Sequence, residues 1–146
     1  MTAKKRLLFL AADHAGFALK EALKQSLPNS VEVHDLSPKL IEGDDYPAVA
    51  KLAAKAVLKY KAEALLVCGT GLGMDIAANR LKGIRAVVVR TPKEAKLSRE
   101  HNHANILILG GRLTKKKEAE AITKAWLRTP FSTESRHVRR IKQLDT

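Results

Sequence analysis

The feature that most constrains the fold is an alternation of short apolar segments with longer amphipathic segments along the whole chain. Strands that alternate with helices in this way are typical of a parallel sheet covered by helices on both faces. The pattern therefore predicts an α/β fold, a doubly wound sandwich with a five-stranded parallel sheet. The predicted strands are Leu7–Ala12, Val31–Leu36, Ala64–Cys68, Ala86–Val89 and Ile106–Leu109, and the predicted helices are Phe17–Leu27, Pro47–Lys59, Gly73–Leu81, Pro92–Glu100, Lys117–Arg128 and Glu134–Leu144.

Length and composition favour a single domain over residues 1–146. Hydrophobic residues make up 45% of the 146 positions. A domain of this length buries roughly two-thirds of the surface of its unfolded chain, so a sizeable core can form. No linker rich in Pro, Gly or Ser and no internal repeat divides the chain.

The single cysteine and the N-terminal segment indicate a cytoplasmic protein. Cys68 has no partner for an internal disulfide and cannot build a cysteine-rich zinc site. The basic start Met1–Arg6 resembles the first part of an export signal, but Asp13 and His14 interrupt the apolar run behind it. We therefore expect neither export nor a membrane span.

The charge balance is strongly basic, with 27 Lys and Arg against 15 Asp and Glu, which gives a formal net charge of +12. Such an excess is the first sign of a nucleic-acid partner. However, aromatic residues make up only 4% of the chain, and the lysines follow the spacing of helix surfaces rather than alternating with stacking residues. A solvated basic surface that attracts anions is favoured, and an anion- or RNA-binding module remains as an alternative.

Three glycines at alternate positions follow the third predicted strand: Gly69, Gly71 and Gly73. Backbone N–H groups of such a loop can converge on an anion at the start of a helix. The spacing differs from the dinucleotide fingerprint, and Gly73 is followed by Met74 rather than by the lysine of a nucleotide P-loop. The loop thus predicts an anion site of another kind.

Cys68 lies directly before this loop, where the N–H groups and the helix dipole are expected to favour its thiolate form. A cysteine phosphatase needs an arginine six residues after its nucleophile, and Met74 occupies that position. A cysteine hydrolase with His101 or His14 as its base remains possible.

Polar residues that could complete a site flank the other strands. We expect His14, His101 and His103 at the edge of the sheet that binds ligands. Their spacing gives no helical metal-binding pair, so the sequence predicts no metal and no other cofactor. Arg136 and Arg140 share one face of the last helix, as suits a phosphate. Together these parts suit proton transfer beside the carbonyl of a phosphorylated sugar, where an enediolate must be stabilised.

Seven motifs in order resemble the type B ribose-5-phosphate isomerases, and the match covers nearly the whole chain. The motifs are Asp13-His14-Ala-Gly16-Phe-x-Leu-Lys20, Asp45-Tyr46-Pro47, Cys68-Gly-Thr-Gly-x-Gly73 with Ile76-Ala-Ala-Asn79, Gly83-Ile-Arg-Ala86, His101-Asn102-x-x-Asn105, Gly110-x-Arg112 and Arg136-His137-x-x-Arg140. The wider group also acts on galactose 6-phosphate and allose 6-phosphate. The resemblance therefore implies an aldose–ketose isomerase that interconverts ribose 5-phosphate and ribulose 5-phosphate, with a six-carbon sugar phosphate as the alternative substrate.

The resemblance also implies roles for individual residues. Cys68 matches the base that moves a proton between adjacent carbons, because members without this cysteine use a glutamate where this chain has Met74. His101 matches the residue that opens the sugar ring, and Thr70 matches a residue that assists proton exchange at the oxygens. The substrate-binding residues implied are Asp13, His14, Tyr46, Gly69, Thr70, Gly71, Leu72, Gly73, Asn102, Arg112, Arg136, His137 and Arg140.

The resemblance implies a Rossmann-like fold and a homodimer, in which two sites are built from both subunits. The sequence leaves a tetramer of two dimers open. The C-terminal helix, about residues 134–144, is then expected to reach the partner's site. Asp75 follows the glycine loop, and we expect its carboxylate to face away from it.

Overall fold

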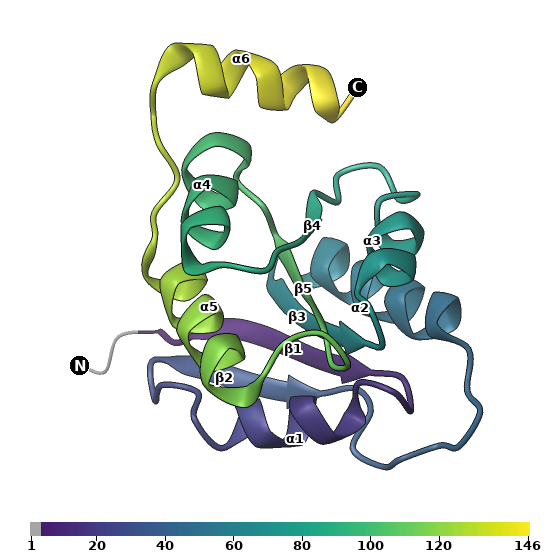
Figure 1. The fold of residues 1–146 in the computed structure, drawn as a ribbon. Helices are drawn as coiled ribbons and strands as arrows, with labels where there is room; N and C mark the ends of the chain where they lie inside the picture. Colours follow the sequence, from purple (N-terminus) through teal and green to yellow (C-terminus); the bar gives the residue numbers. More distant parts are fainter. Residues whose placement is uncertain (1–3) are drawn as a thin grey trace.

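The protein folds around a parallel sheet with helices on both faces (Figure 1). The computed structural model describes residues 4–146, so the first half of the basic segment Met1–Arg6 lies outside the described residues. The elements are β1 (Arg6–Ala12), α1 (Phe17–Lys24), β2 (Val31–Asp35), α2 (Tyr46–Tyr60), β3 (Glu63–Cys68), α3 (Leu72–Ala78), β4 (Ala86–Val88), α4 (Pro92–Asn102), β5 (Ile106–Gly110), α5 (Lys116–Arg128) and α6 (Ser135–Leu144). The strand order is β2-β1-β3-β5-β4, and every neighbouring pair is parallel. This arrangement confirms the predicted fold class.

Alternation along the strands divides the core between the two faces of the sheet. Leu8 and Leu10 of β1 pack in the cluster that includes residues of α1, α4 and α5. Phe9 and Ala11, which point the other way, pack in the cluster with α2 and α3. Because successive side chains of a strand point to opposite faces, an apolar run without polar interruptions is required when helices cover both sides.

Two helices are shorter than their periodicity predicts. Helix α1 ends at Lys24 rather than Leu27, since the residue before Pro28 is disfavoured in helical backbone. Helix α3 ends at Ala78 rather than Leu81, because the side chain of Asn79 bonds to both backbone groups of Ala86 in β4. Pro47 and Pro92 lie in the first turns of α2 and α4, as predicted.

Helix α6 projects from the body of the protein (Figure 1). It contacts α4 and buries His137 and Ile141, whereas Arg136 and Arg140 remain exposed. Within residues 4–146, no helix combines the length and the apolarity needed to cross a membrane.

Candidate active site

The glycine loop joins β3 to α3 at the carboxyl edge of the sheet. Its turn requires glycine at position 71, where the backbone has a φ of 84°. The neighbouring loop after β5 is tied to it, since Gly111 N donates to Cys68 O at 2.6 Å and Arg112 N donates to Gly69 O at 2.9 Å. Two backbone hydrogen bonds thus join the glycine loop to the loop after β5.

Cys68 ends β3 with its side chain inside the core, and only 4% of the residue is exposed. The N–H of Gly71 donates to its Sγ at 3.2 Å. Burial nevertheless raises the pKa of the Cys68 thiol above its usual value, and the carboxylate of Asp13 adds to the rise, while backbone N–H groups oppose it. The expectation of a favoured thiolate is wrong for the single chain, because the loss of solvation exceeds the effect of the N–H groups.

Asp13 and His14 follow β1 and reach the same edge. Asp13 is buried, and its Oδ1 accepts a bond from the N–H of Gly16 at 3.0 Å. Both the backbone N–H and the ring Nδ1 of His14 contact Asp44 Oδ1, at 2.8 and 3.0 Å. The bond to Asp44 raises the pKa of His14, which leaves a cationic ring beside the loop over a wider pH range.

Two further predicted residues close around the loop. The ring of Tyr46 lies so near Gly73 that a Cβ built there would be 2.5 Å from a ring carbon. The guanidinium of Arg112 lies against Gly69, 3.1 Å from the position that a Cβ would take. Thr70 and Leu72 are exposed at the start of α3, and Thr70 Oγ1 accepts a bond from Leu72 N at 3.3 Å. We call this set the thiol group: Asp13, His14, Tyr46, Cys68, residues 69–73 and Arg112.

Met74 and Asp75, which follow the glycine loop, both have their side chains engaged within the fold. Met74 is fully buried, so its position offers no alternative base. The carboxylate of Asp75 contacts the side chain of Asn79 at 2.6 Å and the N–H of Val88 at 3.3 Å. Asp75 is thus engaged with the edge strand β4.

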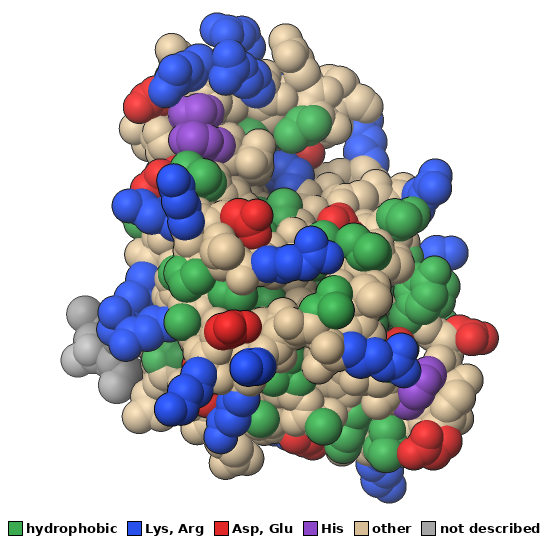
Figure 2. All heavy atoms as spheres, in the orientation of Figure 1, with side chains coloured by type: hydrophobic (Ala, Val, Ile, Leu, Met, Phe, Trp, Pro, Cys, Tyr) green, Lys and Arg blue, Asp and Glu red, His purple; other side chains and the backbone are tan. Residues whose placement is uncertain are grey.

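The remaining predicted residues gather elsewhere, where the end of α4 meets α6. The rings of His101 and His137 stack with their centroids 4.4 Å apart. Figure 2 shows adjacent histidine side chains at the surface in the upper part of the molecule, below the basic side chains of the last helix. Arg136 and Arg140 flank this pair on α6, and Asn102 ends α4. Burial, His101 and Arg136 lower the pKa of His137. We call this set the histidine group: His101, Asn102, Arg136, His137 and Arg140.

His101 and His103 do not lie at the edge of the sheet where the sequence analysis placed them. His101 and His103 precede β5, and Cys68 is in register with Gly110 at the other end of that strand. Five residues of strand separate the two edges, which is about 15 Å. The expected position of His101 and His103 at the ligand-binding edge is therefore wrong, because residues just before a parallel strand lie at its amino end.

Asp44 is the contact that the sequence analysis missed. It lies in the irregular segment between β2 and α2, where no periodicity indicates which side chain faces inward.

No group of three or more metal-ligating side chains occurs within the described part of the chain. The chemical groups that the thiol group offers to a ligand include the Cys68 thiol, the backbone N–H groups of residues 69–73, the His14 ring and the Arg112 guanidinium.

The ion pair between His14 and Asp44 predicts a measurable titration. In Asp44→Asn, the His14 ring loses its carboxylate partner, so its pKa falls and the ring becomes neutral at lower pH. An NMR titration can follow this, since the chain has only five histidines. The neighbouring Glu42→Gln is the control and should leave the titration unchanged. An unchanged His14 pKa in Asp44→Asn would contradict the assignment.

Comparisons with known proteins agree with this geometry. The sequence model of the Ribose/Galactose Isomerase family matches residues 8–144. The chain is 39% identical to ribose-5-phosphate isomerase B of Escherichia coli over 96% of its length and 94% of that protein. A ribose 5-phosphate isomerase structure from Thermotoga maritima superimposes with a TM-score of 0.91 and 44% identity, covering 97% and 99% of the two chains. The enzyme of Mycoplasma genitalium with bound ribulose-5-phosphate gives a TM-score of 0.91 at 36% identity, covering 97% and 95%.

Proposed function

Because the chain belongs to the ribose/galactose isomerase family, we propose that it interconverts ribose 5-phosphate and ribulose 5-phosphate. It is an aldose–ketose isomerase that works by proton transfer through an enediolate. The observation that carries this proposal is the buried thiol of Cys68, with the N–H of Gly71 donating to its sulfur. A base and oxyanion donors in contact are what carbon deprotonation beside a carbonyl needs.

In the proposed reaction, Cys68 removes the proton from the carbon beside the carbonyl and returns it to the neighbouring carbon. Negative charge develops on the oxygens, and the amides of residues 69–73 stabilise it. Thr70 Oγ1 is exposed at the loop and suits proton exchange at those oxygens. No cofactor takes part in these steps.

We propose that the working site joins the thiol group of one subunit to the histidine group of its partner in a homodimer. The two groups lie at opposite edges of one sheet, so one subunit cannot bring both to one sugar. Exposed apolar side chains beside the glycine loop support a contact between the two subunits at α3, because a monomer would leave these side chains in water. Leu72 is 50% exposed and Ile76 60% exposed on the turns of α3 that follow the loop. The projecting α6 carries the arginines that would reach the partner's substrate.

The charges fit a phosphate at this junction. Arg136 and Arg140 are exposed on α6, and in the thiol group the hydrogen bond to Asp44 raises the pKa of His14, which favours the cationic form of its ring. Planar arginine forks bind phosphate oxygens in pairs. The same cations would lower the pKa of Cys68 on assembly, which offsets the rise that burial causes in the single chain.

Other functions have less support. In a cysteine hydrolase, a histidine must contact the thiol, but His101 lies at the other edge of the sheet, and within residues 4–146 the hydrogen bond to Cys68 Sγ comes from the backbone N–H of Gly71 rather than from a histidine. The family description includes galactose, so a six-carbon sugar phosphate remains the second candidate substrate.

A panel of pentose and hexose phosphates, assayed with and without EDTA, separates the candidate substrates. We expect ketose to form fastest from ribose 5-phosphate, with equal rates in EDTA, and absence of ketose from every sugar would contradict the proposal.

Ring opening provides a test of His101. Cyclic sugars hide the carbonyl, so a separate acid and base must open the ring before Cys68 can act. We expect His101→Asn to slow turnover of the cyclic sugar by about 10²-fold or more, but to affect an acyclic analogue far less. His103→Asn is a matched control two residues away and should retain activity. Equal losses on both substrates would exclude a role in ring opening.

A further inference from the structure

A cavity of about 680 Å³ opens at the amino edge of the sheet, away from the glycine loop. Segments that are distant in sequence form it: the start of β1, the turn between α2 and β3, the segment before β4 and the end of α4. Its cationic lining residues are Lys4, Lys5, Arg6, Lys61, Arg85 and Arg99. Neither the isomerase reaction nor the proposed dimer site uses these six side chains.

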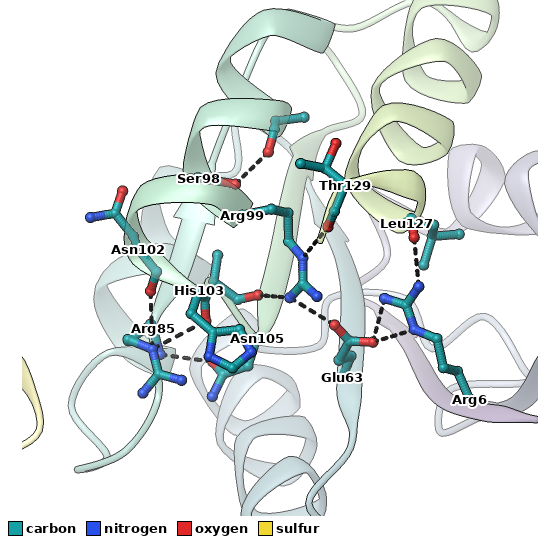
Figure 3. A network of polar contacts seen from close by, with 12 residues as sticks. Arg6, Glu63, Arg85, Ser98, Arg99, Asn102, His103, Asn105, Leu127 and Thr129 are labelled. Carbon is teal, nitrogen blue, oxygen red and sulfur yellow. Dashed lines mark hydrogen bonds and ion pairs between the residues drawn. The ribbon is translucent and has the colours of Figure 1, made fainter. Parts of the chain in front are cut away.

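The positive charge of this cavity is only partly neutralised. Glu63, the one carboxylate among the described lining residues, contacts Arg6 at 2.6 Å and Arg99 at 2.7 Å (Figure 3). Arg85 pairs with Asp145 at 2.6 Å. Among residues 4–146, Lys4, Lys5 and Lys61 have no carboxylate within ion-pair distance, and all three are exposed. Two carboxylates therefore face six cations.

The cations also act on one another. Arg99 is buried, and the charges of Arg6 and Arg85 contribute to lowering its pKa. Burial lowers the pKa of His103, whose ring lines the cavity, and the charges of Arg99 and Arg85 add to this fall. An anion in the cavity would offset this repulsion and would bring three free ammonium groups into contact with its oxygens.

Part of the cavity wall is apolar. Leu7, Leu58 and Tyr60 line it, and Tyr60 is 56% exposed, with Lys59 Nζ 5.2 Å from the centre of its ring. A cavity of this volume matches a metabolite-sized ligand, and the aromatic ring provides a surface for a planar group. Charged groups and an apolar wall within one cavity suit a ligand that has both kinds of surface.

From this arrangement we infer that the cavity binds a small metabolite with two or more linked phosphate groups. The phosphates contact Lys4, Lys5 and Lys61, and a planar group such as a nucleobase lies against Tyr60. The cavity adjoins the histidine group, since Arg85 Nε donates to the backbone oxygen of Asn102 at 3.1 Å, but its lysines are not part of that group, and we expect both sites to be occupied at once.

Calorimetric titration of the full chain with tripolyphosphate, ATP and inorganic phosphate tests this inference. We expect tripolyphosphate and ATP to bind, with ATP tighter because of the apolar wall, and inorganic phosphate to bind at least tenfold more weakly. The variant Lys4→Gln/Lys5→Gln/Lys61→Gln should weaken tripolyphosphate binding at least tenfold. The control Lys51→Gln/Lys55→Gln/Lys124→Gln loses the same charge from exposed lysines elsewhere and should retain it.

Binding should persist when ribulose 5-phosphate saturates the isomerase site, and Tyr60→Ala should remove the advantage of ATP over tripolyphosphate. Equal weakening in both triple variants would show attraction to net charge alone and overturn the inference. Displacement of tripolyphosphate by ribulose 5-phosphate would also overturn it, because the anion would then occupy the isomerase site. Binding of a short single-stranded RNA without binding of tripolyphosphate would assign the surface to nucleic acid instead.

Discussion

Replacing Cys68 with alanine will abolish isomerisation while ribulose 5-phosphate still binds. The Cys68 sulfur accepts a hydrogen bond from the N–H of Gly71 in the glycine loop, and the buried Met74 removes the alternative position for a base. General base catalysis contributes roughly 10²- to 10⁴-fold, so kcat should fall by at least about 10²-fold. Calorimetric binding of ribulose 5-phosphate measures the retained affinity. Turnover within tenfold of the parent would contradict the assignment.

A control is needed because Cys68 is buried. Met74→Leu changes a buried neighbour with little change in volume, and it should retain most of the activity. Urea unfolding of both variants checks that neither loses its fold. Cys68→Ser separates geometry from chemistry, since a hydroxyl fills the same space but is a far weaker base at neutral pH; it should be nearly as inactive as Cys68→Ala.

The sequence was sufficient to predict the fold because the determining pattern is local. Runs such as Ala64–Cys68 have no polar interruption, which only a strand covered on both faces requires. The differences occur at the ends of α1 and α3. There, a proline and a bond from Asn79 to β4 stop helices whose periodicity continues. The effect of Pro28 is local and could be seen in the sequence, whereas the bond from Asn79 joins two elements that meet only after folding.

The candidate site was predicted less completely, because its chemistry depends on contacts between distant segments. The glycine loop and its cysteine are contiguous in sequence and could be identified. The pKa of Cys68 depends on how deeply β3 buries it and on Asp13, which reaches it from β1. The wrong edge for His101 was avoidable, since position before a strand already indicates the amino end. Asp44 has no signal in the sequence.

Replacing the two arginines of α6, Arg136 and Arg140, is expected to cause the second large loss of activity. Charge-assisted bonds to a phosphate contribute roughly 1.5–3 kcal/mol each, so Arg136→Ala/Arg140→Ala should lower kcat/KM by about 10² to 10⁴-fold. Both side chains are exposed, so the fold should be unaffected. Arg139→Ala, one position away and outside the histidine group, is the control. A loss below tenfold in the double variant would remove these arginines from phosphate binding.

The central claim is that each site takes its thiol group from one subunit and its histidine group from the other. Mixing inactive Cys68→Ala with inactive Arg136→Ala/Arg140→Ala tests it, with subunit exchange confirmed by mass spectrometry. In a heterodimer, one of the two sites then has both groups intact, so a random equal mixture should recover about a quarter of the parent activity. If heterodimers form and no activity returns, the arginines serve their own subunit's site and the shared site is wrong.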